Sequence, residues 1–157
     1  MARRRGRPRR PRDGDGHEPA QRLILDANIL FSAAKSDGAI RALVTRLLHA
    51  GHDCQVDGYV IEEARRNIVA KAPGHLPQLE ALLPRLRISP VVPARARIDL
   101  PGLPEKDRLV LAAAAALGCD ALVTGDRTHF GRSFGRTVAG VRIHSPRSLY
   151  DDLFSGS

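Results

Sequence analysis

The sequence is poor in aromatic residues and in cysteine. Its 157 residues include no tryptophan, two tyrosines and four phenylalanines, so base stacking on aromatic side chains is expected to contribute little to ligand binding. The two cysteines, Cys54 and Cys119, show no C-x-x-C spacing and no nearby histidine cluster. The sequence allows two interpretations of this pair, namely two buried free thiols or one disulfide. We predict free thiols, which suit a reducing cytoplasm.

Long apolar segments are also absent. The longest uninterrupted apolar run extends from Leu109 to Leu117, which is far too short to span a bilayer. The N-terminal region is rich in arginine and has no apolar stretch behind it, so no secretory signal peptide is predicted. We therefore expect a cytoplasmic protein without membrane contacts, and its length is that of a single domain.

Positive charge is distributed unevenly along the chain. The formal net charge is +8, and residues 1–20 hold seven arginines against three acidic residues. This segment has almost nothing to bury, so we predict a disordered basic arm over residues 1–20 that contacts nucleic acid without sequence specificity. Within it, residues 5–8 (Arg-Gly-Arg-Pro) resemble the core of an AT-hook. A generic polyanion-binding tail and an over-extended translation start are the alternatives.

Strand-like and helix-like patterns alternate after residue 20. Apolar residues recur at helical spacing in residues 39–50, and Gly51 ends that stripe. This alternation predicts an α/β domain over residues 21–157, in which helices cover both faces of a central parallel sheet. The predicted strands are residues 22–25, 54–56, 88–92, 121–124 and 141–143, and the predicted helices are residues 39–50, 59–70, 76–83, 105–117 and 147–153.

Four acidic residues are expected to converge at one edge of this sheet. Asp26 directly follows the first strand, and Asp126 closes the segment that contains the strand at 121–124. Glu63 lies in the helix predicted after the second strand, and Asp107 lies in the first turn of an alanine-rich helix. Ligands of α/β folds bind at the carboxyl ends of the strands. Because clustered carboxylates repel one another, the set predicts a hard divalent cation held by oxygen ligands.

Each acid also has a structural explanation. Asp26 and Asp126 can cap the helices or turns that follow them, and Asp107 can oppose the dipole of its helix. Glu62 and Glu63 point about 100° apart on one helix, so only one of them can face the sheet edge; Glu63 is the preferred candidate. The joint placement favours a site, because four independent caps need not fall on one edge.

Other polar residues near the acids have candidate roles. Asn28 can orient the first carboxylate, and Thr124 can supply a hydroxyl at a strand end. Gly125 is expected to let the chain bend sharply after that strand. Arg127 and His129 can steady a phosphate, or they can be solvated loop residues.

These motifs resemble those of a PIN domain, the metal-dependent nuclease fold found in VapC-like toxins of bacterial toxin–antitoxin pairs. The resemblance covers about residues 22–153. One departure is Asp57-Gly58, where the family often has Ser or Thr; Asp57 can cap the following helix equally well. The segments that resemble family motifs are residues 25–30 (the D-x-N motif), 59–63 (the second acid), 103–114 (the third), 122–126 (the fourth) and 140–146 (the last strand and helix).

The resemblance implies a three-layer α/β/α sandwich that hydrolyses phosphodiester bonds of single-stranded RNA. It implies Asp26, Glu63, Asp107 and Asp126 as catalytic residues, with Asp26, Asp107 and Asp126 as ligands of Mg²⁺ or Mn²⁺. Asn28 and Thr124 would support these ligands. An antitoxin partner and a homodimer are further expectations of the same kind.

Two other classes of function remain open. The first is a PIN-like module that binds nucleic acid without cutting it. The second is a phosphate-handling α/β domain, which would share the acid after the first strand. A phosphatase of the haloacid-dehalogenase kind would have an acid at position 28, where this chain has Asn28, and a receiver domain would have a lysine late in the chain, where the last one is Lys106.

Overall fold

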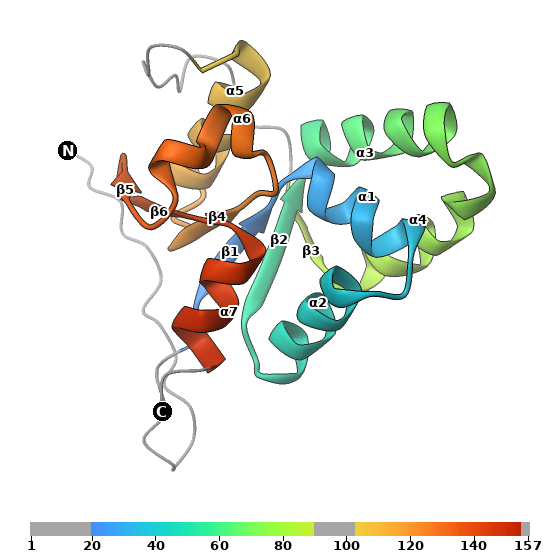
Figure 1. Ribbon diagram of the computed structural model, residues 1–157, viewed down its shortest axis with the longest axis horizontal. Helices are drawn as coiled ribbons and strands as arrows, with labels where there is room; N and C mark the ends of the chain where they lie inside the picture. The colour runs from blue at the N-terminus through green and yellow to red at the C-terminus, as the bar shows by residue number, and fades with distance from the viewer. Residues whose placement is uncertain (1–19, 90–102, 155–157) are drawn as a thin grey trace.

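The computed structural model describes residues 20–89 and 103–154 (Figure 1). The predicted basic arm therefore lies outside the described residues, apart from Ala20. The elements are β1 (Arg22–Leu25), α1 (Ala27–Lys35), α2 (Ala39–His49), β2 (Asp53–Asp57), α3 (Gly58–Lys71), α4 (Leu76–Leu82), β3 (Arg87–Ser89), α5 (Glu105–Ala116), β4 (Ala121–Val123), α6 (Arg127–Phe130), β5 (Thr137–Val138), β6 (Val141–His144) and α7 (Pro146–Phe154), with short 3₁₀ turns at Pro73–His75, Leu83–Arg85 and Gly131–Ser133.

The described strands form one sheet in the order β3-β2-β1-β4-β6-β5. Neighbouring strands are parallel, except that the edge strand β5 runs antiparallel to β6. The chain adds β2 and β3 on one side of β1 and then returns to add β4 on the other side. This reversal makes the carboxyl ends of β1 and β4 the switch point, where open α/β sheets bind their ligands.

Helices cover both faces of the sheet. In Figure 1, α2 and α7 lie in front of the sheet and α5 lies behind it. Right-handed crossovers require this arrangement, because the β1-to-β2 and β3-to-β4 connections run in opposite directions across the sheet. Helices α2 and α7 are joined by Arg46, which donates a hydrogen bond to the Tyr150 hydroxyl at 3.2 Å and lies 4.2 Å from the ring centre of Phe154. The predicted α/β class with a layered architecture is confirmed.

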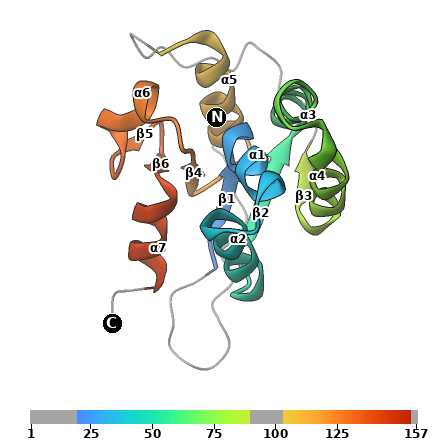
Figure 2. The same ribbon diagram turned by 45° about the vertical axis from the view of Figure 1, so that its right-hand side comes forward.

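The hydrophobic core lies along the two central strands. Leu23, Ile24 and Leu25 of β1 are fully buried, as are Leu122 and Val123 of β4. Burial on both sides explains why these strands are continuous apolar runs without polar alternation. Figure 2 shows α3 and α4 grouped beside β3, while α6 and α7 lie on the opposite side of β1. The switch point therefore lies between two groups of helices.

Most predicted elements are present with ends that differ by a few residues. The helix ending at Gly51 was expected to include Ala50 but ends at His49, and Gly51 adopts a φ of 88°, which suits glycine. The strand predicted at 88–92 begins earlier, at Arg87, and its residues 90–92 lie outside the described ones. The edge strand β5 was not predicted, because two residues are too few to show a periodic pattern.

Two predictions from composition are also tested. Cys54 and Cys119 are buried and free, as expected, and burial raises the pKa of both thiols to about 12. No helix among the described residues is long and apolar enough to cross a membrane.

Candidate metal centre

Asp26 stands at the switch point between β1 and β4. Its backbone N–H donates to the Val123 carbonyl at 2.9 Å, which extends the pairing of the two strands by one residue. Its side chain also caps α1, because Oδ1 accepts a hydrogen bond from the Ala27 N–H at 2.8 Å. The capping role considered from the sequence is therefore real, and one oxygen performs it. The second oxygen is directed elsewhere.

Thr124 and Asn28 hold this second oxygen. The Thr124 hydroxyl donates to Asp26 Oδ2 at 2.8 Å, and Asn28 Nδ2 approaches the same oxygen at 3.4 Å. Asn28 also joins the segment after β4 to α1, since its Oδ1 accepts from the Gly125 N–H at 2.8 Å. Thr124 is fully buried and its hydroxyl also accepts from the Asp126 N–H at 3.1 Å. Asn28 and Thr124 therefore hold the Asp26 carboxylate through hydrogen bonds, while their support of a metal ligand stays a prediction.

The Asp26 carboxyl group is in an environment that disfavours its charge. Only 7% of the residue is exposed. Burial raises its pKa to about 6, and the charges of Asp107 and Glu63 act in the same direction, while the hydrogen bonds from Thr124 and Ala27 oppose the rise. A nearby cation would favour the charged form of the carboxyl group and lower its pKa.

Asp107 reaches the same edge from the first turn of α5. It is 4% exposed, and burial together with the charge of Asp126 raises its pKa. Its buried Oδ2 has no hydrogen-bond partner. The nearest donor is His129 Nδ1 at 3.1 Å, but an imidazole Nδ1 carries one hydrogen at most, and Asp126 Oδ2 is closer to it. A buried carboxylate oxygen without a donor is the arrangement that a metal ion would satisfy.

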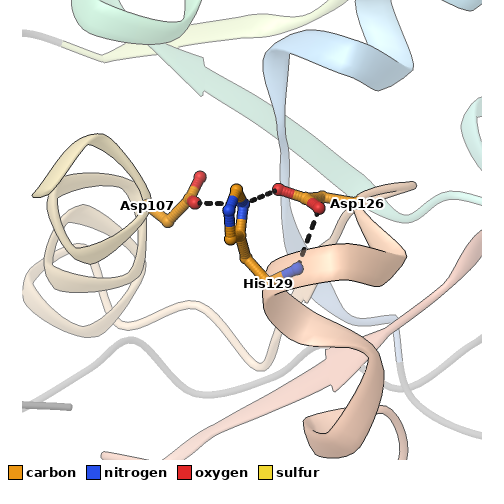
Figure 3. Close-up of side chains that lie close together, drawn as sticks. All are labelled: Asp107, Asp126 and His129. Atoms are coloured by element: carbon orange, nitrogen blue, oxygen red, sulfur yellow. Dashed lines mark hydrogen bonds and ion pairs between the residues drawn. The ribbon is translucent and has the colours of Figure 1, made fainter. Parts of the chain in front are cut away.

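Asp126 and His129 complete this side of the site (Figure 3). Asp126 caps the short helix α6, because Oδ1 accepts from the His129 N–H at 3.0 Å, and its Oδ2 lies 2.7 Å from His129 Nδ1. Although burial opposes it, these two contacts with His129 lower the pKa of Asp126. The imidazole thus lies between the Asp126 and Asp107 carboxylates, as Figure 3 shows.

Glu63 approaches the acids from α3. It accepts a hydrogen bond from Lys106 Nζ at 3.1 Å, and its charge contributes to the raised pKa of both Asp26 and Asp107. Glu62 is exposed on the same helix. The structure thus brings Glu63, and not Glu62, close enough to Asp26 and Asp107 for its charge to act on both. The pKa of Lys106 is raised, first by its bond with Glu63 and then by the charge of that residue.

The donors of this centre fit a divalent cation. One ligand atom each from Asp107, Asp126 and His129 lie within 4.8 Å of one another, which is close enough for a single ion to contact all three. Asp26 is near enough for the charge of Asp107 to raise its pKa. Carboxylate oxygens suit Mg²⁺ and Mn²⁺, and an imidazole nitrogen suits transition metals such as Mn²⁺ better than it suits Mg²⁺.

Two features of the site were not predicted from the sequence. The hydrogen bond between Lys106 and Glu63, which are distant in sequence, was not foreseen. His129 was considered as a phosphate contact or a solvated loop residue, and its position beside Asp107 was not foreseen either. The i, i+3 spacing of Asp126 and His129 at a helix start is the signal that could have revealed the second contact. Gly125 is not among the glycines with positive φ, so no left-handed backbone requires glycine there. Its N–H donates a hydrogen bond to Asn28 Oδ1.

Comparison with known proteins identifies the class of fold. No protein-family model matches the chain, and no curated protein matches its sequence. Several solved structures do match. A chain of the VapBC2 complex of Rickettsia felis, bound to a DNA fragment from its promoter, superposes with a TM-score of 0.60 and 18% identity over 79% of this chain and 98% of its own length.

Two further solved structures are similar to this chain over most of its length. PAE2754 of Pyrobaculum aerophilum gives a TM-score of 0.62 at 18% identity over 87% of this chain and 91% of its own. VapC20 of Mycobacterium tuberculosis, a toxin that cleaves the sarcin–ricin loop, gives 0.53 at 15% identity over 71% and 95%. The chain therefore has the PIN-domain fold of VapC-like proteins, as its motifs indicated.

Proposed function

We propose that this protein is a metal-dependent endoribonuclease that hydrolyses phosphodiester bonds of single-stranded RNA. The observation on which the proposal rests is the buried Asp107 Oδ2, which has no hydrogen-bond donor and faces Asp126 across His129. Beside it, Asp26 has a pKa raised to about 6. Such a set of crowded acids is costly in the absence of a cation, and it is useful if a cation binds there.

Each residue of the centre has a proposed role. Asp26, Asp107 and Asp126 would hold Mg²⁺ or Mn²⁺, with His129 as a further donor. The ion supplies an acidified water and neutralises charge on the phosphate. Thr124 and Asn28 keep the Asp26 carboxylate in one orientation through their hydrogen bonds. Glu63 would accept a proton from water, because its carboxylate lies at the partly exposed side of the site with Lys106.

The biological setting is proposed from the resemblance. VapC20 is a toxin that cleaves the sarcin–ricin loop, and the VapBC structures are complexes bound to DNA. We infer that this chain is likewise the toxin of a toxin–antitoxin pair in the cytoplasm, with an antitoxin as its protein partner and a homodimer as its own assembly. Light scattering after gel filtration, alone and with the product of an adjacent small reading frame, tests both associations.

Cleavage of labelled single-stranded RNA by the purified protein tests the nuclease activity. We expect cutting with Mn²⁺ or Mg²⁺, none with EDTA, and a loss of at least about a hundredfold in Asp107→Asn, as expected when a metal-binding or charge-stabilising group is removed. Thermal unfolding of the same samples gives an independent readout, because an ion that binds the native state alone raises its stability. Mn²⁺ should raise the melting temperature of the wild type and leave that of Asp107→Asn unchanged.

Matched variants on α3 sharpen this experiment. Glu63→Gln should lose cleavage, whereas Glu62→Gln removes the same charge from an exposed neighbour and should retain it. If RNA binds equally well in the wild type and in Asp107→Asn but is not cut by either protein, the chain is a non-catalytic nucleic-acid-binding module. Hydrolysis of a small phosphomonoester instead of RNA would favour the phosphate-handling class.

A further inference from the structure

The chain between Asp126 and the next acid, Asp151, is strongly basic. It contains five arginines and no aspartate or glutamate. Four of these arginines are exposed and belong to neighbouring elements on one side of the candidate site, and we call them the arginine face: Arg127 of α6, Arg132 and Arg136 of the turn that follows, and Arg142 of β6.

The arginine face is carried on a fixed scaffold. Phe130 of α6 is fully buried, which fastens the helix to the core. The turn is tied to β6, because the Gly135 N–H donates to the Ile143 carbonyl at 2.7 Å and the Ile143 N–H donates to the Arg136 carbonyl at 2.9 Å. Figure 1 shows α6, β5 and β6 together at one end of the sheet, with α6 next to α5. The face therefore begins directly beside Asp126.

Six of the twelve arginines and lysines elsewhere in the described structure have acidic partners. Arg41, Arg65 and Arg87, for example, pair with Asp37, Glu80 and Asp53. Within residues 20–89 and 103–154, by contrast, no ion pair involves any arginine of the face. Arg142 donates to the Gly135 carbonyl, which leaves its charge uncompensated. An unpaired row of positive charges favours a polyanion.

The composition of the face favours nucleic acid over a protein partner. The large exposed hydrophobic residues of the described structure are Tyr59 and Val69 on α3, Ile88 on β3 and Tyr150 on α7. None lies on α6, β5 or β6. Protein interfaces are built around buried aromatic and aliphatic anchors, whereas a phosphate backbone is held by arginine and polar groups without them.

We infer that the arginine face binds the sugar–phosphate backbone of a single-stranded RNA and leads it into the acidic centre from the α6 side. Choosing RNA rests on the proposed nuclease function; the anionic backbone follows from the face itself. Arg127, next to Asp126, contacts the phosphate nearest to the scissile one, and Arg132, Arg136 and Arg142 contact phosphates further along the strand.

Fluorescence anisotropy in EDTA tests this inference without requiring any cleavage. The probe is a short, unstructured, fluorescein-labelled RNA, titrated with the full chain at several salt concentrations. Arg127→Gln/Arg132→Gln/Arg136→Gln should weaken binding roughly tenfold or more, and it should reduce the slope of log affinity against log salt by about 2, because each single-strand phosphate contact contributes about 0.7. The three residues are exposed, so the fold should be retained, as circular dichroism can verify.

A variant with the same change in charge on the other side of the molecule is the control. Arg66→Gln/Lys71→Gln/Arg85→Gln also removes three exposed positive charges, from α3 and the turn before β3. It should bind RNA nearly as the wild type does. Equal losses in both triple variants would reduce the effect to net charge and overturn the inference, as would unchanged binding in the face variant. If the protein fails to cut RNA with Mn²⁺ but the face variant still loses binding, the nuclease proposal fails and the arginine face stands.

Discussion

The two sides of the candidate metal centre differ in whether their carboxylate oxygens have hydrogen-bond donors within the protein. On the β1 side, Asp26 uses both carboxylate oxygens, one on the Ala27 N–H and the other on Thr124 and Asn28. On the α5 side, Asp107 keeps a buried oxygen without a donor. Both oxygens of Asp26 already accept hydrogen bonds and keep lone pairs for a cation, whereas Asp107 Oδ2 has no hydrogen-bond donor at all.

This difference suggests how the fold distributes rigidity and affinity. The Asp26 side stands on the two central strands, where a carboxylate can be fixed by hydrogen bonds that add no net charge. The Asp107 side comes from two helix starts, α5 and α6, which the sequence places far from β1. Fixed orientation on one side and unsatisfied acceptors on the other are both needed for a site that binds a cation in one geometry.

Replacing Asp26 gives the largest expected effect on stability. Its pKa is raised by burial, so the native state holds a proton more tightly than the unfolded chain, and the stability it contributes falls as the pH rises from about 4 to about 6. Asp26→Asn lacks this dependence. In EDTA, the variant should therefore gain on the wild type by on the order of 3 kcal/mol between about pH 4 and pH 7.5, since one pKa unit is worth about 1.4 kcal/mol.

Urea unfolding at a series of pH values measures this gain. Asp37→Asn is the control, because Asp37 is an exposed residue whose side chain is 87% accessible. The free energy of unfolding of Asp37→Asn should follow that of the wild type at every pH. The contrary result is a free energy of unfolding of Asp26→Asn that changes with pH in parallel with that of the wild type. In that case burial does not disfavour the charged Asp26 carboxylate, and the contrast between the two sides of the centre disappears.

Replacing Thr124 should reduce the fixed orientation of the β1 side. Thr124→Val keeps the shape of the side chain but removes the hydroxyl that donates to Asp26 Oδ2 and accepts from the Asp126 N–H. Losing a buried hydrogen bond to a charged group costs about 2 kcal/mol, and urea unfolding near neutral pH should show this loss. Thr137→Val, on the exposed edge strand β5, serves as the control. A loss no larger than that of the control would mean that Asp26 is not held by Thr124.

The same contrast explains how much of the site the sequence could predict. Asp26 and Thr124 follow continuous apolar strands, and the topological rule for parallel sheets places such strand ends together. The positions of Asp26 and Thr124 at neighbouring strand ends could therefore be predicted, and the structure joins them by a hydrogen bond, while their role in a metal site stays a prediction. The Asp57 cap of α3 was predicted for a similar local reason, and Asp57 Oδ1 accepts from the Val60 N–H at 3.0 Å.

The other side depends on how helices are turned, which periodicity does not determine. The sequence could place Asp107 in a first turn, but not the rotation of α5 that buries its carboxylate against His129. The partnership of Lys106 with Glu63 joins residues 43 positions apart on two helices. No local pattern encodes such a pair, and only tertiary packing creates it. The antiparallel strand β5 was missed because it is defined by its partner β6 and not by its own two residues.

Replacing His129 should give the smallest effect and distinguishes two roles for the imidazole. His129 Nδ1 lies 2.7 Å from Asp126 Oδ2 and 3.1 Å from Asp107 Oδ2. If this nitrogen becomes a ligand, His129→Ala should weaken Mn²⁺ binding about tenfold and Mg²⁺ binding less, because nitrogen donors favour the transition metal.

Isothermal titration calorimetry with each ion near neutral pH separates these roles. His75→Ala is a suitable control, since His75 is exposed and lies in a turn away from the acids; both of its affinities should equal those of the wild type. If the imidazole only occupies the space between Asp107 and Asp126, a metal must displace it, and His129→Ala would then bind both ions more tightly. That result would remove the nitrogen donor from the centre and leave the α5 side as an all-carboxylate site, chemically closer to the Asp26 side than the present geometry indicates.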